Sequence, residues 1–458
     1  MKLLILAAVG VAIGLAIAWV PFPINLVIPA GVVLLILMVL YPLGIVVILL
    51  GLSTTRIFWR AGGIAPEELI YSLTFLVLLG ASFLRELLRG ETGRPPRWET
   101  PLALPVFCMG LLGLLWAVVG ILRGHLFAHW TSDLNFILFF WLYFVIAVSA
   151  ADTRDIYKVI WPTASVTIGV VLWGIASRIK EGTLFIGYIP GFAKGMAFSS
   201  TFFILSVCLF LFSERGTFRR KRFFLLSLFF GLHQFLSFVR VAWISQIGAA
   251  SFLLLVFPAS KRRSFLKGMG IFCLLMSLVF ITSWVIPTDH PVVKTPTYLM
   301  NRFMSIFTDV GGEGVTMRTR YSEWGAALRK YTEHPILGHG LGTQIQYILY
   351  SYPRHPWTTE RYIHSSYIYY LLNTGPIGLT VFLWFCFVSV RYGLQVYRRL
   401  PPSEPKGLAL GMTASVVFQI FSAIAGNELS SPLRTLWTGF FLGTLAVIDR
   451  QTRGTETK

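Results

Sequence analysis

Charged residues, and acids above all, are scarce in this chain. Only 13% of its 458 residues are charged, and 20 Asp and Glu stand against 39 Lys and Arg. A soluble domain carries about 25% charged residues, so the composition excludes an ordinary water-soluble globular protein. Because 55% of the residues are hydrophobic and the mean hydropathy is +0.70, lipid must be the solvent for much of the protein surface.

The chain also has few residues that are suited to metal binding. Four cysteines lie inside apolar runs and lack the spacing of metal ligands, so we interpret them as packing residues: Cys108, Cys208, Cys273 and Cys386. The segments that we predict to face outward hold no carboxylate cluster with the spacing of a hard-cation site. The sequence therefore predicts no metal site.

Apolar runs make up most of the chain. They are residues 3–20, 24–40, 43–58, 67–88, 101–122, 132–150, 156–176, 195–213, 222–238, 241–257, 265–286, 365–390, 407–426 and 432–449. The longer runs reach the roughly 20 residues needed to cross a bilayer. The first three are short enough to merge or to lie partly in the interface. We therefore predict an all-α polytopic membrane protein with about 12 to 14 transmembrane helices.

No repeat or low-complexity linker divides the chain. Residues 1–286 predict an N-terminal transmembrane bundle, residues 287–364 one large outer loop, and residues 365–458 C-terminal transmembrane helices with a cytoplasmic tail. The loop is mixed in charge and long, which favours a folded subdomain over a structureless connection. The first apolar run also has features of a signal peptide. Because the next run begins almost at once, at Ile24, we predict a first transmembrane helix instead.

The net charge of +19 sets orientation and does not indicate a nucleic-acid partner. Most of the surplus lies in short loops between apolar runs, where the positive-inside rule places it in the cytoplasm. These clusters are Arg85–Arg97, Arg215–Arg222, Lys261–Lys267, Arg391–Lys406 and the tail from Arg450. Threading the runs between the clusters places five segments on the outer side: residues 59–66, 123–131, 177–194, 287–364 and 427–431.

Two arginines are candidates for function on that outer side. Arg240 interrupts two apolar runs in the sequence SFVRVAWIS. A charge at membrane depth costs at least about 2.5–3.5 kcal/mol on insertion scales, although an arginine can also snorkel to the interface. Arg320 lies one turn before Trp324, beside a predicted amphipathic helix over Ser322–Lys330; the alternative is a solvated helix-face charge. We expect the backbone amides of the turn at Gly338–Gly342, which follows, to line an anionic group.

A histidine completes the constellation. His364 stands directly after the outer loop and before a long apolar helix, in HSSYIYYLLNTGPIG; the alternative is an interfacial residue that caps the helix. Arginine forks match phosphate oxygens, and an imidazole can remove a proton from a hydroxyl. Together these groups predict a transferase in which arginines hold a diphosphate leaving group while a base activates an incoming alcohol.

At this point the residues resemble a known family. His364–Gly378 resembles the O-antigen ligase signature, His-[Asn/Ser/Gln]-x9-Gly-x-x-[Gly/Thr/Tyr], at every position. Arg320–Gly342 resembles the pattern R-x-x-x-W … hP-hydrophobic-hydrophobic-G-x-G-x-G that precedes it, and VRVAW resembles SRGAW with Val239 and Val241 replacing Ser and Gly. The resemblance covers about residues 195–450. The superfamily comprises lipid A-core O-antigen ligases, Wzy-type polysaccharide polymerases and some protein O-oligosaccharyltransferases.

The resemblance implies a metal-independent enzyme without a cofactor, in the bacterial inner membrane, with a periplasmic active site. It implies that His364 is the general base and that Arg240 and Arg320 bind the pyrophosphate of an undecaprenyl-diphosphate-linked glycan. The acceptor is then a sugar hydroxyl of lipid A-core. Outward-facing residues of second rank are Arg318, Arg361, His339, Lys194 and Arg178. Glu428 and Arg434, near the last outer turn, are predicted to pair with each other or with the site.

Two other functions are weighed against the ligase. A Wzy-type polysaccharide polymerase uses the same donor, base and arginines, but the serine after His364 and the nine-residue spacing favour the ligase. A transporter of lipid-linked glycan is disfavoured because the apolar runs hold almost no Asp or Glu, and transporters usually need intramembrane acids or broken helices near the midplane.

Overall fold

The computed structural model describes residues 36, 38, 40–53, 66–89, 96–180, 193–235, 239–285, 304–305, 314–350 and 357–456. The first predicted span, the signal-peptide alternative and most of the second span lie outside the described residues. So do the side chains of Arg178 and Lys194, although both residues belong to described helices.

The described chain is almost entirely helical, which confirms the predicted all-α polytopic fold. Its helices are α3 (Pro42–Ser53), α4 (Pro66–Leu88), α5 (Ala103–Leu122), α6 (Phe127–Leu138), η2 (Phe139–Trp141), α7 (Leu142–Ser149), α8 (Thr153–Lys180), α9 (Ala193–Phe212), α10 (Phe218–Phe235), α11 (Arg240–Val256), α12 (Ala259–Val285), α14 (Val315–Tyr331), α15 (Ser366–Arg399), α16 (Glu404–Ser422) and α17 (Pro432–Glu456). Within these residues, five helical segments are long and apolar enough to cross a membrane: Glu68–Leu88, Ala103–Leu122, Phe127–Ser149, Thr153–Ala176 and Ser366–Arg399.

Helix α17 lies at the centre of the bundle. It contacts α3, α6, η2, α7, α8, α15 and α16. Its Phe441, Leu442 and Leu445 side chains have no exposed surface, as expected for the apolar middle of a buried helix. Gly439 and Gly443 let its backbone approach the preceding segment closely, because a Cβ at either position would lie 2.9 Å from a carbonyl oxygen of η2 or α7.

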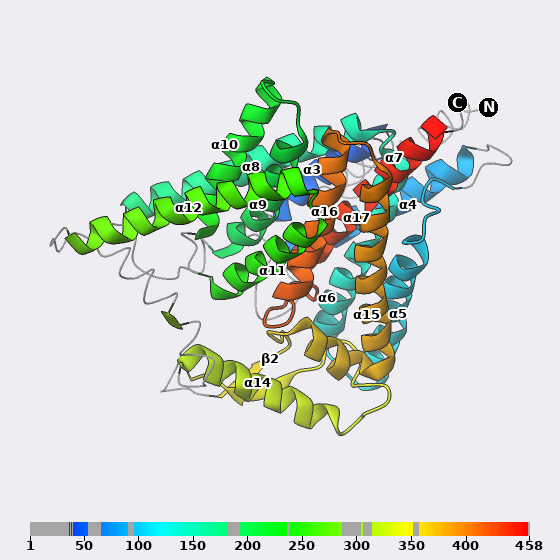
Figure 1. Ribbon diagram of the computed structural model, residues 1–458. Coiled ribbons are helices and arrows are strands. Elements are labelled where there is room, and N and C mark those ends of the chain that lie inside the picture. The colour runs from blue at the N-terminus through cyan, green and yellow to red at the C-terminus, as the bar shows by residue number, and fades with distance from the viewer. Residues whose placement is uncertain are drawn as a thin grey trace.

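The two ends of the bundle differ in composition. Figure 1 shows α14 and the strands at one end, which we call the loop face, and the start of α10, the end of α15 and the C terminus at the other. The end opposite the loop face carries the basic clusters at Arg215–Arg222, Arg391–Lys406 and Arg450. The opposition of loop and basic clusters is the arrangement that the sequence predicted.

The loop face has its own small folded unit. Strand β1 (Ile345–Ile348) pairs in antiparallel register with β2 (Trp357–Glu360), so that Ile345 lies opposite Glu360. The hairpin is fastened to α14, because Ser322 Oγ accepts the Ile348 N–H at 3.0 Å and Thr319 Oγ1 accepts the Tyr350 N–H at 3.1 Å. Four-residue strands of this kind give too short an alternation to be found in the sequence.

Candidate functional site

His364 and Glu323 form a paired base and acid on the loop face. Nδ1 of His364 contacts the two carboxylate oxygens of Glu323 at 3.1 and 3.0 Å, and the His364 backbone N–H donates to Glu323 Oε1 at 3.1 Å. The Glu323 side chain is fully buried, whereas that of His364 is 50% exposed. An ionised carboxylate only accepts hydrogen bonds, so this contact assigns the ring proton to Nδ1 and leaves Nε2 as the basic nitrogen.

Glu323 lies on the buried face of α14, which small and polar residues form. Thr319, Glu323, Ala326 and Ala327 recur at helical spacing and form its buried face. This face packs against α15. Trp324 adds a second link, since its Nε1 donates to the His364 carbonyl at 3.3 Å. The acid and the two backbone contacts therefore fix both the ring and the main chain of His364.

The spacing after His364 also has a structural meaning. Ser365 caps α15, and its Oγ accepts the Ile368 N–H at 3.4 Å. The helix then runs to Gly375, where φ of 64° breaks it into two segments; that left-handed conformation favours glycine. A Cβ at Gly375 would also lie 3.0 Å from the backbone nitrogen of Gly338. The nine residues between Ser365 and Gly375 are thus a short helix that holds His364 at a fixed place relative to the kink.

The backbone amides of the turn at Gly338–Gly342 are hydrogen-bonded within the protein, mainly to α5, α6 and α15. The expectation that these amides line an anion is therefore wrong. All five amides donate to the protein itself: Gly338 to His334 O at 3.0 Å, His339 to Leu372 O at 2.8 Å, Gly340 to Asn373 O at 2.9 Å, Leu341 to Trp116 O at 3.0 Å, and Gly342 to Asp133 Oδ2 at 2.8 Å. Gly340 has φ of 82°, and a Cβ there would lie 2.7 Å from Gly120 Cα. The glycines allow the turn to sit directly on α5 and α15.

Arg361 is buried and joins the loop to α6. Its side chain is 4% exposed, Nη1 lies 3.3 Å from Asp133 Oδ1, and the same nitrogen donates to the His129 carbonyl at 2.8 Å. Asp133 thus holds both Arg361 and the Gly342 amide. This placement favours an anchoring role for Arg361 over a role in binding phosphate.

The two principal arginines lie on different elements, Arg240 on α11 and Arg320 on α14 within the loop. Arg240 is the first residue of α11, and its Nη1 donates to the carbonyl oxygen of Ser305 at 3.2 Å and to its hydroxyl at 3.1 Å. Ser305 belongs to the connection between α12 and α14. Arg320 stands three residues before Glu323 on α14, or about 4.5 Å along the helix axis. The gathering of Arg240, Arg320 and His364 around one ligand stays a prediction.

The residues of second rank differ in setting. Arg318 is exposed on α14. His339 is buried, with Nε2 2.6 Å from the Lys330 carbonyl oxygen, and burial lowers its pKa. Its setting is that of a packing residue within the loop unit.

A further carboxylate lies near the paired base and acid. The pKa of Glu360, the last residue of β2, is raised by burial and by the negative charge of Glu323. Burial and the same two acids raise the pKa of Tyr347. The carboxyl groups of Glu323 and Glu360 are therefore close enough to influence each other. Among the described residues, no three His, Cys, Asp or Glu side chains are grouped as a metal ion would require.

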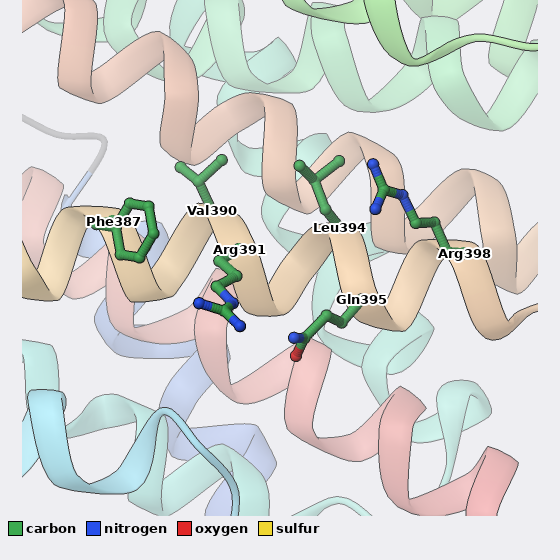
Figure 2. Close-up of a pocket in the computed structure, with 6 residues that line it drawn as sticks. All are labelled: Phe387, Val390, Arg391, Leu394, Gln395 and Arg398. Carbon is green, nitrogen blue, oxygen red and sulfur yellow. The ribbon is translucent and has the colours of Figure 1, made fainter.

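A groove of about 410 Å³ lies along the basic end of α15 (Figure 2). Phe387, Val390, Arg391 and Arg398 are among the residues that line it. A helix rises about 1.5 Å per residue, so Arg391 lies roughly 24 Å beyond the kink at Gly375, on the far segment of α15 from His364. This groove is therefore remote from the paired histidine and glutamate.

Glu323 is the functional candidate that the sequence interpretation missed. A signal was present, because an acid between Thr319 and Ala327 occupies the apolar face of an amphipathic helix. A carboxylate is rarely buried without a partner. Its partner is 41 residues further along the chain, which only the folded structure brings close.

The fold and the site define a polytopic helical membrane protein with a histidine–glutamate pair beside a folded loop. Residues 223–383 match the family model Wzy_C, described as O-Antigen ligase. Residues 223–383 therefore match a domain of the O-antigen ligase and Wzy-type superfamily, which supports the predicted family and a membrane enzyme of the ligase or polymerase kind. The match includes Arg240, Glu323 and His364. No curated protein matches the chain.

Proposed function

We propose that this protein is an O-antigen ligase that moves a glycan from undecaprenyl diphosphate to a sugar hydroxyl of lipid A-core. The observation that carries the proposal is the contact between His364 and the buried carboxylate of Glu323. An exposed imidazole with a fixed tautomer and a buried counter-charge is suited to take a proton from a substrate. The reaction requires one such base.

In the proposed reaction, Nε2 of His364 takes the proton of the acceptor hydroxyl as its oxygen attacks the anomeric carbon of the donor. The bond between that carbon and the diphosphate oxygen breaks, and undecaprenyl diphosphate leaves with the bonding electron pair. Glu323 accepts the Nδ1 proton in a hydrogen bond throughout and stabilises the imidazolium that forms. The proton on Nε2 is returned to solvent after transfer.

Arg240 and Arg320 have the role of binding the diphosphate. Negative charge grows on the leaving group as the glycosidic bond breaks, and guanidinium groups stabilise it without loss of their own charge. Arg240 is the first residue of the apolar helix α11, and an arginine at the end of such a helix suits contact with a diphosphate at the membrane surface. We place the reaction at the periplasmic surface of the inner membrane, because the loop face is opposite the basic clusters.

Deletion of the gene separates a ligase from a Wzy-type polymerase. Loss of a ligase leaves long glycan on the lipid carrier, whereas loss of a polymerase leaves single repeat units on lipid A-core. The lipopolysaccharide profile of the deletion strain is the measurement. We expect stranded long glycan, and single repeat units on lipid A-core would replace the ligase proposal by the polymerase.

Variants of the purified protein test the residues. His364→Ala should abolish transfer with membrane insertion intact. Arg240→Lys should be much slower than wild type, because a point charge does not replace the planar fork; Arg262→Lys, in the basic cluster at the start of α12, is the matched control. Transfer at wild-type rate by His364→Ala would remove His364 from the mechanism.

A further inference from the structure

A second arginine–carboxylate pair lies at the loop face, between α16 and α17. Glu428, in the turn between the two helices, forms an ion pair with Arg434 in the first turn of α17. Ser422 Oγ donates to Glu428 Oε1 at 2.8 Å. The side chain of Glu428 is 10% exposed and that of Arg434 is 25% exposed. The arginine is therefore the more accessible member of the pair.

The surroundings of this pair are largely aromatic. A small cavity reaches both charges and is lined by Phe198, Phe418 and Trp437 together with Thr201 and Gln419. Charged groups held among apolar side chains at the edge of a membrane are costly, and they commonly mark a path for an ion or a polar substrate. The cavity has a volume of about 10 Å³, which is room for one water molecule. A phosphate oxygen that reaches Arg434 must therefore take the place of the Glu428 carboxylate.

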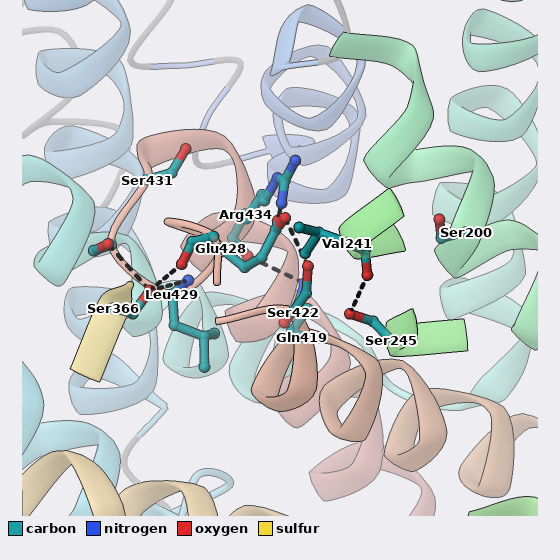
Figure 3. A network of polar contacts seen from close by, with 12 residues as sticks. Ser200, Val241, Ser245, Ser366, Gln419, Ser422, Glu428, Leu429, Ser431 and Arg434 are labelled. Atoms are coloured by element: carbon teal, nitrogen blue, oxygen red, sulfur yellow. Dashed lines mark hydrogen bonds and ion pairs between the residues drawn. The ribbon is translucent and has the colours of Figure 1, made fainter. Parts of the chain in front are cut away.

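The turn that carries Glu428 is hydrogen-bonded to Ser366, close to His364 in the chain. Ser366, two residues after His364, donates its backbone N–H to the Ala423 carbonyl at 2.9 Å, and its Oγ accepts the Leu429 N–H at 3.1 Å. Ser366 and Ser430 hydroxyls are also 3.1 Å apart. Figure 3 shows this connection beside Glu428 and Arg434.

The pair lies beside the helix that begins with Arg240. Helix α11 packs along α16, and Figure 3 draws Val241 in the same view as Ser422 and Arg434. Helices α11 and α15 begin, and α16 ends, toward the loop face (Figure 1). Arg434, which follows the end of α16, is therefore at the same end of the bundle as Arg240 and His364.

We propose that Arg434 is a further diphosphate-binding residue and that Glu428 is its displaceable counter-ion, an inference that rests on the proposed function. In the structure the carboxylate of Glu428 pairs with the guanidinium of Arg434. An isoprenyl diphosphate competes with the carboxylate for it, since both offer oxygens to the same fork. The competition limits how tightly the departing undecaprenyl diphosphate is held, so that the product leaves.

The test is the dissociation constant of undecaprenyl diphosphate for the purified full-length protein in lipid nanodiscs. Glu428→Gln keeps an oxygen that can accept from Ser422 but removes the charge. It should tighten binding by about tenfold, within the range typical of coupling between two binding events, and should strengthen product inhibition by the same factor. Arg434→Gln should weaken binding. Inorganic pyrophosphate, used as a second probe, should bind more weakly to every variant if the isoprenyl chain contributes.

A double variant tells whether the gain acts through Arg434. Glu428→Gln together with Arg434→Gln should bind no more tightly than Arg434→Gln alone. Glu404→Gln is the matched control, because Glu404 pairs with Arg219 at 3.7 Å at the opposite end of α16, and it should leave the dissociation constant unchanged. If Glu428→Gln does not fold, Ser422→Ala replaces it and should tighten binding to a smaller degree.

The outcomes separate the inference from the proposed function. The inference is overturned if Glu428→Gln binds undecaprenyl diphosphate no more tightly than wild type. It is also overturned if Glu428→Gln and the double variant gain the same affinity. In both cases the proposed function stands as long as the wild-type protein transfers glycan. If the wild-type protein neither binds undecaprenyl diphosphate nor transfers a glycan from it, the proposed function itself fails.

Discussion

Replacing Glu323 by glutamine is expected to slow glycan transfer without weakening donor binding. The substitution keeps the shape of the side chain and one oxygen that can accept the Nδ1 proton of His364. It removes the charge that stabilises the imidazolium as the proton is taken up. Because Glu323 is fully buried, water cannot replace that charge.

The expected fall in kcat follows from the strength of the contact between Glu323 and His364. A hydrogen bond to a charged group contributes about 1.5–3 kcal/mol, and a charge-assisted bond is roughly twice as strong as a neutral one. Glu323→Gln should therefore lose about half of the roughly 3 kcal/mol of transition-state stabilisation that the charged contact supplies, and Glu323→Ala should lose all of it. Since about 1.4 kcal/mol is tenfold in rate, we expect kcat to fall about tenfold in Glu323→Gln and about 100-fold in Glu323→Ala.

The assay is steady-state transfer from a lipid-linked donor, with kcat and KM determined separately. KM for the donor should stay within about twofold in Glu323→Gln, because the acid does not bind the diphosphate. Glu333→Gln is the matched control, since Glu333 also lies near a histidine, His339, at 3.8 Å, but is exposed while the histidine is buried. A wild-type kcat in Glu323→Gln, or a rise in KM alone, would refute the reasoning.

Three further predictions concern the loop unit. Asp133→Ala leaves Arg361 buried without its carboxylate, which should cost about 3–5 kcal/mol and lower the thermal midpoint; an unchanged midpoint would contradict the anchoring role. Gly340→Ala should lower the thermal midpoint as well, because a side chain at φ of 82° also meets the backbone of α5, and Gly325→Ala on α14 serves as its control. The pKa of Glu360 is raised in the folded protein, so its protonated form favours folding. The thermal midpoint of the wild-type protein should therefore fall as the pH rises through the range in which carboxyl groups ionise, and Glu360→Gln should remove this fall.

The fold was largely predictable from the sequence because hydrophobic length alone specifies a transmembrane helix. Runs such as 101–122 and 432–449 match α5 (Ala103–Leu122) and the apolar part of α17 (Pro432–Glu456) closely. The loop unit was less predictable. The helix expected at Ser322–Lys330 extends over Val315–Tyr331, because its first turns are polar and carry no apolar periodicity.

The candidate site was predictable in its local parts and not in its pairings. His364 was found because its spacing to Gly375 is local, and that spacing corresponds to a capped and kinked helix. Glu323 was missed because its partner is distant in the chain. The turn at Gly338–Gly342 was misinterpreted because glycine permits both an anion-binding turn and close helix contact, and only the acceptors of its amides distinguish the two.

A structure of the His364→Ala variant with intact undecaprenyl-diphosphate-linked glycan bound tests the central claim most directly. The variant should retain the donor because the base is missing and the arginines remain. We predict diphosphate oxygens in contact with the guanidinium groups of Arg240 and Arg320, and the anomeric carbon facing the position of the missing imidazole. A donor bound with its diphosphate away from both arginines, or with its sugar directed away from residue 364, would contradict the account.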